Sequence, residues 1–250
     1  MRRIATATGL AALGLAGGLA GVMLVSPTLA AAGRAPAPTC AGERATIVDR
    51  SKAGDRIVGT RRRDVIVAGR GKGRDVVEGL GGDDVICGDA RTVVRGGRGD
   101  DLIVAAGRAD GGRGDDLFHA VGTARGGRGS DAYLAPLATG SFDGGADHDV
   151  VTFYAGYVPG VTSGVYVNLA LGMASAELES GGARIRTGLA GVEEVRGTPD
   201  DDLLLGDALD NVLRGGAGKD VLNGRAGYDT VVGGRDKDVC TGEVREGCEE

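Results

Sequence analysis

Short apolar runs alternate with Gly- and Asp-rich stretches along most of the chain, and this alternation predicts short β-strands separated by tight turns. The clearest stretch runs from Gly197 to Thr241 as five unbroken nonapeptides: GTPDDDLLL, GDALDNVLR, GGAGKDVLN, GRAGYDTVV and GGRDKDVCT. Each begins with Gly, carries Asp or Asn at its sixth place, and has an apolar or Cys residue at its eighth. A strict nine-residue period predicts stacked units that each bury one narrow face against their neighbours.

The same pattern recurs at a longer interval in the first half of the chain. A degenerate copy spans Gly59–Val67, and two tandem copies span residues 70–87. Glycine loops then begin 15–18 residues apart, close to two nonapeptides, at Gly79, Gly96, Gly111, Gly126 and Gly144. The eighth places are predicted to form one inward-facing ladder, and they hold Ile66, Val77, Ile86, Ile103, Phe118, Tyr133, Val151, Leu204, Leu213, Leu222, Val231 and Cys240.

The consensus GG-x-G-x-D-x-U-x of these copies resembles the RTX (hemolysin-type) calcium-binding nonapeptide repeat of secreted bacterial proteins. The resemblance implies an all-β fold, a parallel β-roll (an RTX β-solenoid) with short strands and Gly/Asp-rich turns that bind Ca²⁺. Two repeats make one coil of such a roll, so loops one coil apart stack on the same edge. We therefore expect acidic loops on one edge of the coils over residues 79–153, and on both edges from residue 197 onward.

The resemblance also implies which residues hold the metal. Ca²⁺ is a hard cation that takes carboxylate and carbonyl oxygens, and each ion would lie between two stacked loops. Repulsion between stacked carboxylates would couple folding to Ca²⁺ binding. The expected ligands are the sixth-place residues and the glycines that shape the loops: Asp75, Asp84, Asp101, Asp116, Asp131, Asp149, Asp202, Asn211, Asp220, Asp229, Asp238, Gly97, Gly99, Gly112, Gly114, Gly127, Gly129, Gly216, Gly218 and Gly227.

A metal-free, Gly-rich solenoid is the alternative, and some copies depart from the consensus. Gly59–Val67 carries three Arg residues, Asn211 replaces Asp, and Gly233–Asp236 lacks the fourth-place Gly. These loops are candidates for a purely structural role.

Composition agrees with a narrow repeat fold. The chain has 250 residues with 49 Gly, no Trp and 3% aromatic residues, too few large side chains for a wide aromatic core. So much Gly and Pro also raises the possibility of disorder, but the fixed period argues against it, at least with metal bound. The formal net charge of −6 does not suggest a nucleic-acid partner and suits binding of cations.

Four cysteines imply two disulfides in an exported chain. Three connectivities of Cys40, Cys87, Cys240 and Cys248 are possible, and proximity favours Cys40–Cys87 and Cys240–Cys248. A zinc site is disfavoured, because there is no C-x₂-C pair and His119 and His148 are the only histidines. Both histidines are expected to be ordinary surface residues.

The first residues are typical of a bacterial secretory signal. Arg2 and Arg3 precede an apolar segment over residues 4–25, and small-residue cleavage sites follow after Ala30 or Ala32. An uncleaved membrane anchor is the alternative. After cleavage no stable membrane span is expected, and the predicted location is extracellular.

The repeat is interrupted over residues 154–196. Strands are expected at residues 164–169 and 192–195, with a loop or one helical turn at 175–180. The expected organisation is a signal peptide (1–32), a linker (33–45), N-terminal RTX-like β-roll repeats (46–153), the interruption (154–196), C-terminal RTX repeats (197–241) and a disulfide-clipped tail (242–250).

Enzyme signatures are missing from the sequence. There is no H-E-x-x-H, G-x-S-x-G or P-loop, and the repeats begin too soon after the signal to leave room for a catalytic domain. We therefore expect an exported calcium-binding protein without catalytic residues. The alternative is a Ca²⁺-stiffened scaffold for an unknown cell-surface or matrix partner, and a secreted hydrolase is less favoured.

Two further motifs lie inside the loops. The RGD triplets at residues 98–100 and 113–115 allow an adhesion role, but the repeat already requires Gly and Asp there. The third-place arginines Arg98, Arg113 and Arg128 allow contact with an anionic partner, although solvated charges that offset the Asp residues are the simpler interpretation.

Overall fold

The computed structural model describes residues 38–69, 71–135, 140–154, 164–177 and 184–249. The expected signal peptide lies outside these residues, and so do residues 33–37 of the expected linker.

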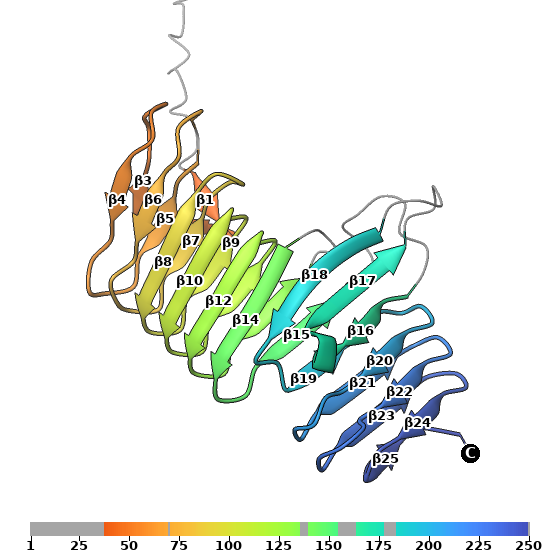
Figure 1. Cartoon of the computed structure of the whole chain (residues 1–250). Helices are drawn as coiled ribbons and strands as arrows, with labels where there is room; N and C mark the ends of the chain where they lie inside the picture. Colours follow the sequence, from red (N-terminus) through yellow and green to blue (C-terminus); the bar gives the residue numbers. More distant parts are fainter. Residues whose placement is uncertain (1–37, 70, 136–139, 155–163, 178–183, 250) are drawn as a thin grey trace, which may run out of the picture. The chain divides into compact units, whose positions relative to one another are not determined.

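Two long sheets contain nearly all the strands, and successive coils add one strand to each (Figure 1). The 12-stranded sheet contains β4 (Arg56–Val58), β6 (Val76–Glu78), β8 (Val93–Arg98), β10 (Arg108–Arg113), β12 (Thr123–Arg128), β14 (Gly140–Ala146), β16 (Tyr166–Asn168), β17 (Met173–Glu177), β18 (Arg184–Ala190), β20 (Leu203–Leu205), β22 (Val221–Asn223) and β24 (Val239–Thr241). The 11-stranded sheet contains β3 (Ile47–Val48), β5 (Val65–Val67), β7 (Val85–Cys87), β9 (Leu102–Val104), β11 (Leu117–His119), β13 (Ala132–Ala135), β15 (Val150–Phe153), β19 (Glu194–Arg196), β21 (Val212–Gly216), β23 (Thr230–Gly234) and β25 (Val244–Glu246). A separate antiparallel pair is formed by β1 (Thr39–Cys40) and β2 (Glu43–Arg44).

Strands of successive coils pair in parallel, for example β8 with β10 and β9 with β11. The described residues include one 3₁₀ turn, η1 (Leu169–Leu171), and are otherwise strands and turns. The predicted all-β fold, a parallel β-solenoid, is confirmed. No described helix has the length and apolar character needed to span a membrane.

The predicted apolar ladder forms the core. All of the eighth-place residues are buried, with exposed fractions between 0% and 8%. In the 11-stranded sheet Ile86 pairs in register with Ile103, and Ile103 with Phe118. Full burial of one such side chain contributes about 1.5–3 kcal/mol, so the ladder stabilises each coil against both neighbours.

Three aromatic rings meet inside the core. Phe142 packs against Tyr133 and Phe118, with ring centroids 5.2 and 6.0 Å apart. The Tyr133 hydroxyl donates a hydrogen bond to the carbonyl oxygen of Val121 at 2.6 Å, so its polar atom is satisfied inside the core.

The interruption is built differently from the repeats. Here β17 pairs antiparallel with both β16 and β18, while β18 joins β14 and β16 joins β20 in parallel. The expected strands correspond to β16 and β19. The expectation of a loop or helical turn at residues 175–180 is wrong for Ser175–Glu177, which belong to β17, whereas residues 178–180 lie outside the described part.

Both favoured disulfides are present. Cys40–Cys87 joins β1 to β7, with Cα atoms 5.6 Å apart, and Cys240–Cys248 joins β24 to the C-terminal tail, at 5.8 Å.

Candidate calcium loops

The sixth-place carboxylates of the first half form a buried column along one edge of the coils. Its members are Asp84, Asp101, Asp116, Asp131 and Asp149, which lie directly before strands of the 11-stranded sheet, whereas Asp75 precedes β6 of the 12-stranded sheet. Oδ1 of Asp101 accepts a hydrogen bond from the backbone N–H of Asp84 at 2.8 Å, and Oδ1 of Asp116 accepts one from Asp101 at 2.9 Å. The series continues from Asp116 to Asp131 and from Asp131 to Asp149, each at 2.8 Å. One carboxylate oxygen per coil therefore holds the neighbouring coil.

The other carboxylate oxygen of these residues is buried and has no hydrogen-bond partner. Asp84 and Asp149 are 0% exposed and Asp116 is 1% exposed. A buried acceptor left unpaired costs about 1–3 kcal/mol, so each such oxygen marks a place where a ligand would stabilise the fold. Among the described residues, Oδ2 is in this state in Asp49, Asp84, Asp101, Asp116, Asp131, Asp149, Asp220, Asp229 and Asp238.

The first glycine of each loop opens a cradle beside that oxygen. A Cβ atom placed on Gly96 would lie 2.2 Å from Oδ2 of Asp101 and 2.7 Å from the carbonyl oxygen of Gly111. Carboxylate and carbonyl oxygens of adjacent coils thus converge, and this is the donor set that Ca²⁺ prefers. No group of three or more His, Cys, Asp or Glu side chains in the described part of the chain can hold a metal by itself. An ion in these cradles would therefore need backbone carbonyls, and the residues present fit Ca²⁺.

Burial makes the column hard to ionise. Loss of water, with a smaller contribution from the carboxylates of Asp101 and Asp131, raises the pKa of Asp116 from its ordinary 3.8 to about 8. The pKa is about 7 for Asp101 and Asp131, and about 6 for Asp84 and Asp149, in each case mainly through burial. The centre of the column therefore has the greatest need of a cation if it is to carry negative charge.

Acidic loops occupy both edges from residue 197 onward, as predicted. On one edge Oδ1 of Asp220 accepts the N–H of Asp202 at 2.8 Å, and Oδ1 of Asp238 accepts that of Asp220 at 2.9 Å. On the other edge Oδ1 of Asp229 accepts the N–H of Asn211 at 2.9 Å. Burial raises the pKa of Asp220 to about 7.

Two of the expected ligands already have both oxygens occupied. Oδ2 of Asp202 accepts the backbone N–H of Thr198 at 2.6 Å, and the Thr198 hydroxyl donates to Oδ1 at 2.9 Å. Oδ2 of Asp75 accepts the N–H of Gly69 at 2.8 Å. The degenerate loop at Gly59 is closed in the same way, because Thr60 donates its N–H to Oδ2 of Asp64 at 2.7 Å. These loops are satisfied by the chain itself.

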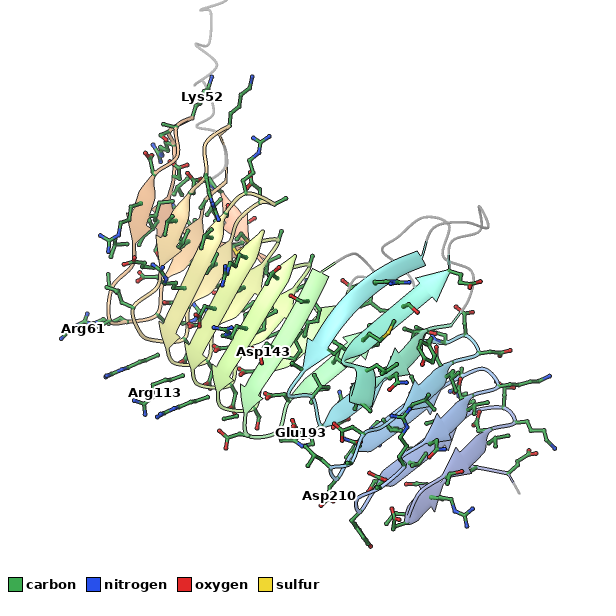
Figure 2. The ribbon with its side chains drawn as sticks, in the orientation of Figure 1. Lys52, Arg61, Arg113, Asp143, Glu193 and Asp210 are labelled. Atoms are coloured by element: carbon green, nitrogen blue, oxygen red, sulfur yellow. A yellow bond between two sulfur atoms is a disulfide. The ribbon has the colours of Figure 1, made fainter. Side chains whose placement is uncertain are left out.

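Two glutamates extend the columns of carboxylates beyond the aspartates, and neither was predicted from the sequence. Oε2 of Glu193 accepts the N–H of Asp149 at 2.8 Å, and Oε2 of Glu243 accepts that of Asp229 at 2.8 Å (Figure 2 labels Glu193). Each stands directly before a strand, β19 or β25, as the sixth-place Asp does. Alignment on that strand start, rather than on the glycines, is the signal that would have found them.

A second set of carboxylates at the fifth place was also missed. Oδ1 of Asp83 accepts the N–H of Asp100 at 3.0 Å, and Oδ1 of Asp100 accepts that of Asp115 at 2.9 Å. A fifth-place carboxylate thus accepts an N–H group of the following coil, whereas a sixth-place carboxylate accepts an N–H group of the preceding coil. The gap between two loops thus receives a carboxylate from each side, which increases its negative charge.

The predicted loop glycines hold backbone conformations that other residues rarely adopt. At Gly114, φ is +126° and an added Cβ atom would lie 2.3 Å from the carbonyl oxygen of Gly99. All nine glycines expected in the sites have positive φ: Gly97, Gly99, Gly112, Gly114, Gly127, Gly129, Gly216, Gly218 and Gly227. At equivalent places Leu80, Arg225 and Asp236 adopt positive φ without being Gly, so the turn geometry survives in degenerate copies.

The remaining candidates lie outside these cradles. Arg98, Arg113 and Arg128 are exposed neighbours in register on β8, β10 and β12. His119 contacts the Tyr154 hydroxyl at 3.0 Å, and His148 lies 3.4 Å from Glu194.

Comparison with protein families agrees with this geometry. A family model described as the RTX calcium-binding nonapeptide repeat matches the chain in four copies, at residues 52–72, 71–90, 196–231 and 205–240. No curated protein matches the chain in a search by sequence. The matched segments include the closed loops as well as the open cradles of the C-terminal half. The chain therefore carries segments that match the RTX calcium-binding nonapeptide repeat, and these segments are stacked in a parallel β-solenoid.

Proposed function

We propose that the protein is an exported, non-enzymatic calcium-binding protein whose ions lie in the open cradles and order the coils. The unpaired buried Oδ2 atoms are the observation that carries this proposal. Without a cation they are desolvated and unpaired, and with Ca²⁺ they gain a partner of the right charge and hardness. Because Asp84, Asp101, Asp116 and Asp131 are linked coil to coil, binding at one loop favours order at the next.

The cradles are proposed to differ in strength. Loops with an unpaired Oδ2, such as those of Asp101, Asp116 and Asp220, are the principal sites. The loops of Asp75 and Asp202 are weaker sites, because backbone N–H groups already occupy their carboxylates. Asn211 contributes a neutral amide and is proposed to add a carbonyl oxygen only. Residues 46–153 and 197–241 are proposed as the two metal-binding arrays, separated by the interruption at 154–196.

The test is a Ca²⁺ titration after chelation, followed by far-UV circular dichroism and calorimetry, with Mg²⁺ as the control ion. We expect a cooperative gain of β signal with Ca²⁺ and not with Mg²⁺, which demands a small octahedral site. Asp116→Asn should lower the number of bound ions, whereas Asp110→Asn, at an exposed position on β10, should not. A spectrum that is fully β in chelator and shows no heat of Ca²⁺ binding would refute the proposal.

Export is proposed from the first 32 residues. It is tested by fusing them to a reporter and sequencing the N-terminus of the secreted product. Cleavage after Ala30 or Ala32 supports export by a signal peptide, and retention of an uncleaved reporter in the membrane contradicts it.

A second role, as a Ca²⁺-stiffened interaction scaffold, is favoured by one surface feature. Leu203, Val221 and Val239 are neighbours in register on β20, β22 and β24, and they are 36%, 43% and 58% exposed. Such an apolar stripe suits contact with a partner surface. Changing all three residues to Thr should release the exported protein from the cell surface without loss of Ca²⁺ binding; unchanged attachment would count against this role.

A further inference from the structure

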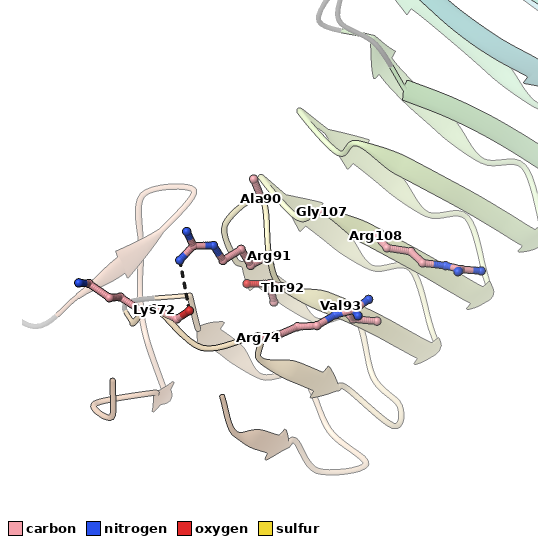
Figure 3. A pocket seen from close by; sticks show the side chains of 8 residues that line it. All are labelled: Lys72, Arg74, Ala90, Arg91, Thr92, Val93, Gly107 and Arg108. Atoms are coloured by element: carbon pink, nitrogen blue, oxygen red, sulfur yellow. Dashed lines mark hydrogen bonds between the residues drawn. The ribbon is translucent and has the colours of Figure 1, made fainter. Parts of the chain in front are cut away.

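A basic pocket lies at three neighbouring turns, one of which is the loop of Asp75, whose two carboxylate oxygens already accept backbone N–H groups. Its volume is about 440 Å³, and its walls come from the turns before β6 and β8 and from the start of β10 (Figure 3). Lys72 and Arg74 belong to the first of these turns, Arg91 to the second, and Arg108 opens β10. The three strands are neighbours in the 12-stranded sheet, about 4.8 Å apart, so the turns that carry these four cationic residues lie side by side.

The pocket contains no acidic side chain to balance these charges. Its lining residues include no Asp or Glu. Asp89 lies in the same turn as Arg91, but its Oδ1 accepts hydrogen bonds from the N–H groups of Arg91 and Thr92, at 2.8 and 3.1 Å, and so shapes the turn. Within the described residues, Lys72, Arg74, Arg91 and Arg108 make no ion pair.

Some other arginines of the same sheet have an acidic partner, whereas Arg98, Arg113 and Arg128 form no ion pair within the described residues. Arg95 binds Glu78 at 3.2 Å, and Arg125 binds Asp143 at 3.4 Å. The four exposed pocket residues carry like charge without a counterion among the lining residues, so their field attracts an anion. Arg91 is held at the site by a hydrogen bond from Nη1 to the carbonyl oxygen of Lys72 at 3.2 Å, which leaves its other N–H groups free for a ligand.

The kind of anion follows from the donors and the space. Three guanidinium groups and one ammonium offer many more donors than the two oxygens of a carboxylate accept, and they match the several oxygens of a phosphate or sulfate. A pocket of about 440 Å³ falls in the size range of small-molecule sites and exceeds the needs of a bare ion. We infer that this pocket binds the phosphate or sulfate group of a small organic ester.

This site is separate from the open calcium cradles of the first half. Asp84, Asp101, Asp116, Asp131 and Asp149 precede strands of the 11-stranded sheet, whereas the pocket residues precede or open strands of the 12-stranded sheet. The expected ligand beside the pocket is Asp75, whose two oxygens already accept backbone N–H groups. Loss of anion binding and loss of Ca²⁺ binding are therefore separable by experiment.

The test is calorimetric titration of the chain in calcium-containing buffer with glucose 6-phosphate, glucose 6-sulfate, inorganic sulfate and unmodified glucose. We expect saturable binding of at least one ester to one site, and none of glucose. The double variant Arg91→Gln, Arg108→Gln should weaken ester binding by about tenfold or more, since each charge-assisted contact contributes about 1.5 kcal/mol or more.

The matched control is Arg95→Gln, Arg125→Gln, which removes the same charge from paired positions on the same sheet. It should change ester affinity by less than about twofold. Equal loss in both double variants would reveal general charge attraction and overturn the site. No saturable binding of either ester, or inorganic sulfate bound as tightly as the esters, would overturn the assignment of an ester ligand.

Discussion

Asp116→Asn should stabilise the metal-free fold while weakening the calcium-bound one. Asp116 is 1% exposed, and its Oδ1 accepts the N–H of Asp101, a bond that the Asn carbonyl oxygen can keep. Its Oδ2 is unpaired, so ionisation at this position has no compensation without a cation. Asn211 shows that the fold accepts an amide at a sixth place.

The magnitude follows from the pKa. Burial raises the pKa of Asp116 from 3.8 to about 8 in the metal-free fold. The folded chain therefore keeps a proton that the unfolded chain loses, and stability falls as pH rises between these values. At about 1.36 kcal/mol per pH unit, the aspartate destabilises the metal-free fold by up to about 4 kcal/mol at about pH 7. Asn does not ionise, so the variant recovers this free energy.

Urea unfolding of both proteins, followed by circular dichroism, measures the effect. In chelator, the free energy of unfolding of the native protein should fall from about pH 5 to about pH 8, and that of Asp116→Asn should fall less. In Ca²⁺ the order should reverse, because Asn lacks the charge that the ion requires. Asp110→Asn, which is exposed, is the matched control. If the variant is less stable than the native protein in chelator at about pH 7, the charge of Asp116 must already be compensated in the metal-free fold, which would contradict this prediction.

Three further outcomes are expected. Gly114→Ala should lower the free energy of unfolding by about 2 kcal/mol or more, because φ is +126° and the new Cβ atom would lie 2.3 Å from a carbonyl oxygen. Gly188→Ala is the control: its new Cβ atom would have its nearest contact at 3.4 Å, so the loss in the same urea assay should be less than about 1 kcal/mol. Removing the Cys40–Cys87 disulfide by Cys→Ser changes should lower the free energy of unfolding by about 4 kcal/mol, and removing Cys240–Cys248 should lower it by about 2.5 kcal/mol, as measured by thermal unfolding. The first loss is larger because the closed loops span 47 and 8 residues, so the reverse order would contradict an entropic origin of the stabilisation. Thr198→Val removes a hydroxyl bond to Asp202 and should cost about 1 kcal/mol in chelator, with calorimetry showing tighter Ca²⁺ binding at that loop; unchanged Ca²⁺ affinity would mean that the hydroxyl does not compete with the ion.

The repeated part of the fold can be predicted from the sequence, because the eighth place of each repeat fixes which side chains of the repeat face inward. A residue at the eighth place, such as Ile103 or Leu213, has to face inward, and the sixth-place Asp then falls at the loop end next to the strand. The nine-residue period thereby predicts the parallel sheets, the two-edged second array and the positive-φ glycines together.

Features without a period could not be predicted in this way. The antiparallel strands β17 and β18 are placed by contacts with β14 and β16, and nothing in their composition separates them from a loop. Glu193 and Glu243 reach the column only because a longer side chain compensates for a missing Asp. The closed loop at Thr198 depends on a local hydroxyl, and the basic pocket depends on side chains at positions that the repeat consensus does not fix.

The bonds between neighbouring carboxylates and backbone amides make each coil of the first array interchangeable with the next. The coils that begin at Gly96 and Gly111 are each 15 residues long and share the loop GGRGDD. Deletion of residues 111–125 in frame would bring Asp131 to the amide of Asp101, where Asp116 now stands, and would join Asp110 to Gly126 without a change of register. The array can therefore shorten or lengthen by whole coils, and its number of calcium cradles can change by one at a time with the fold intact.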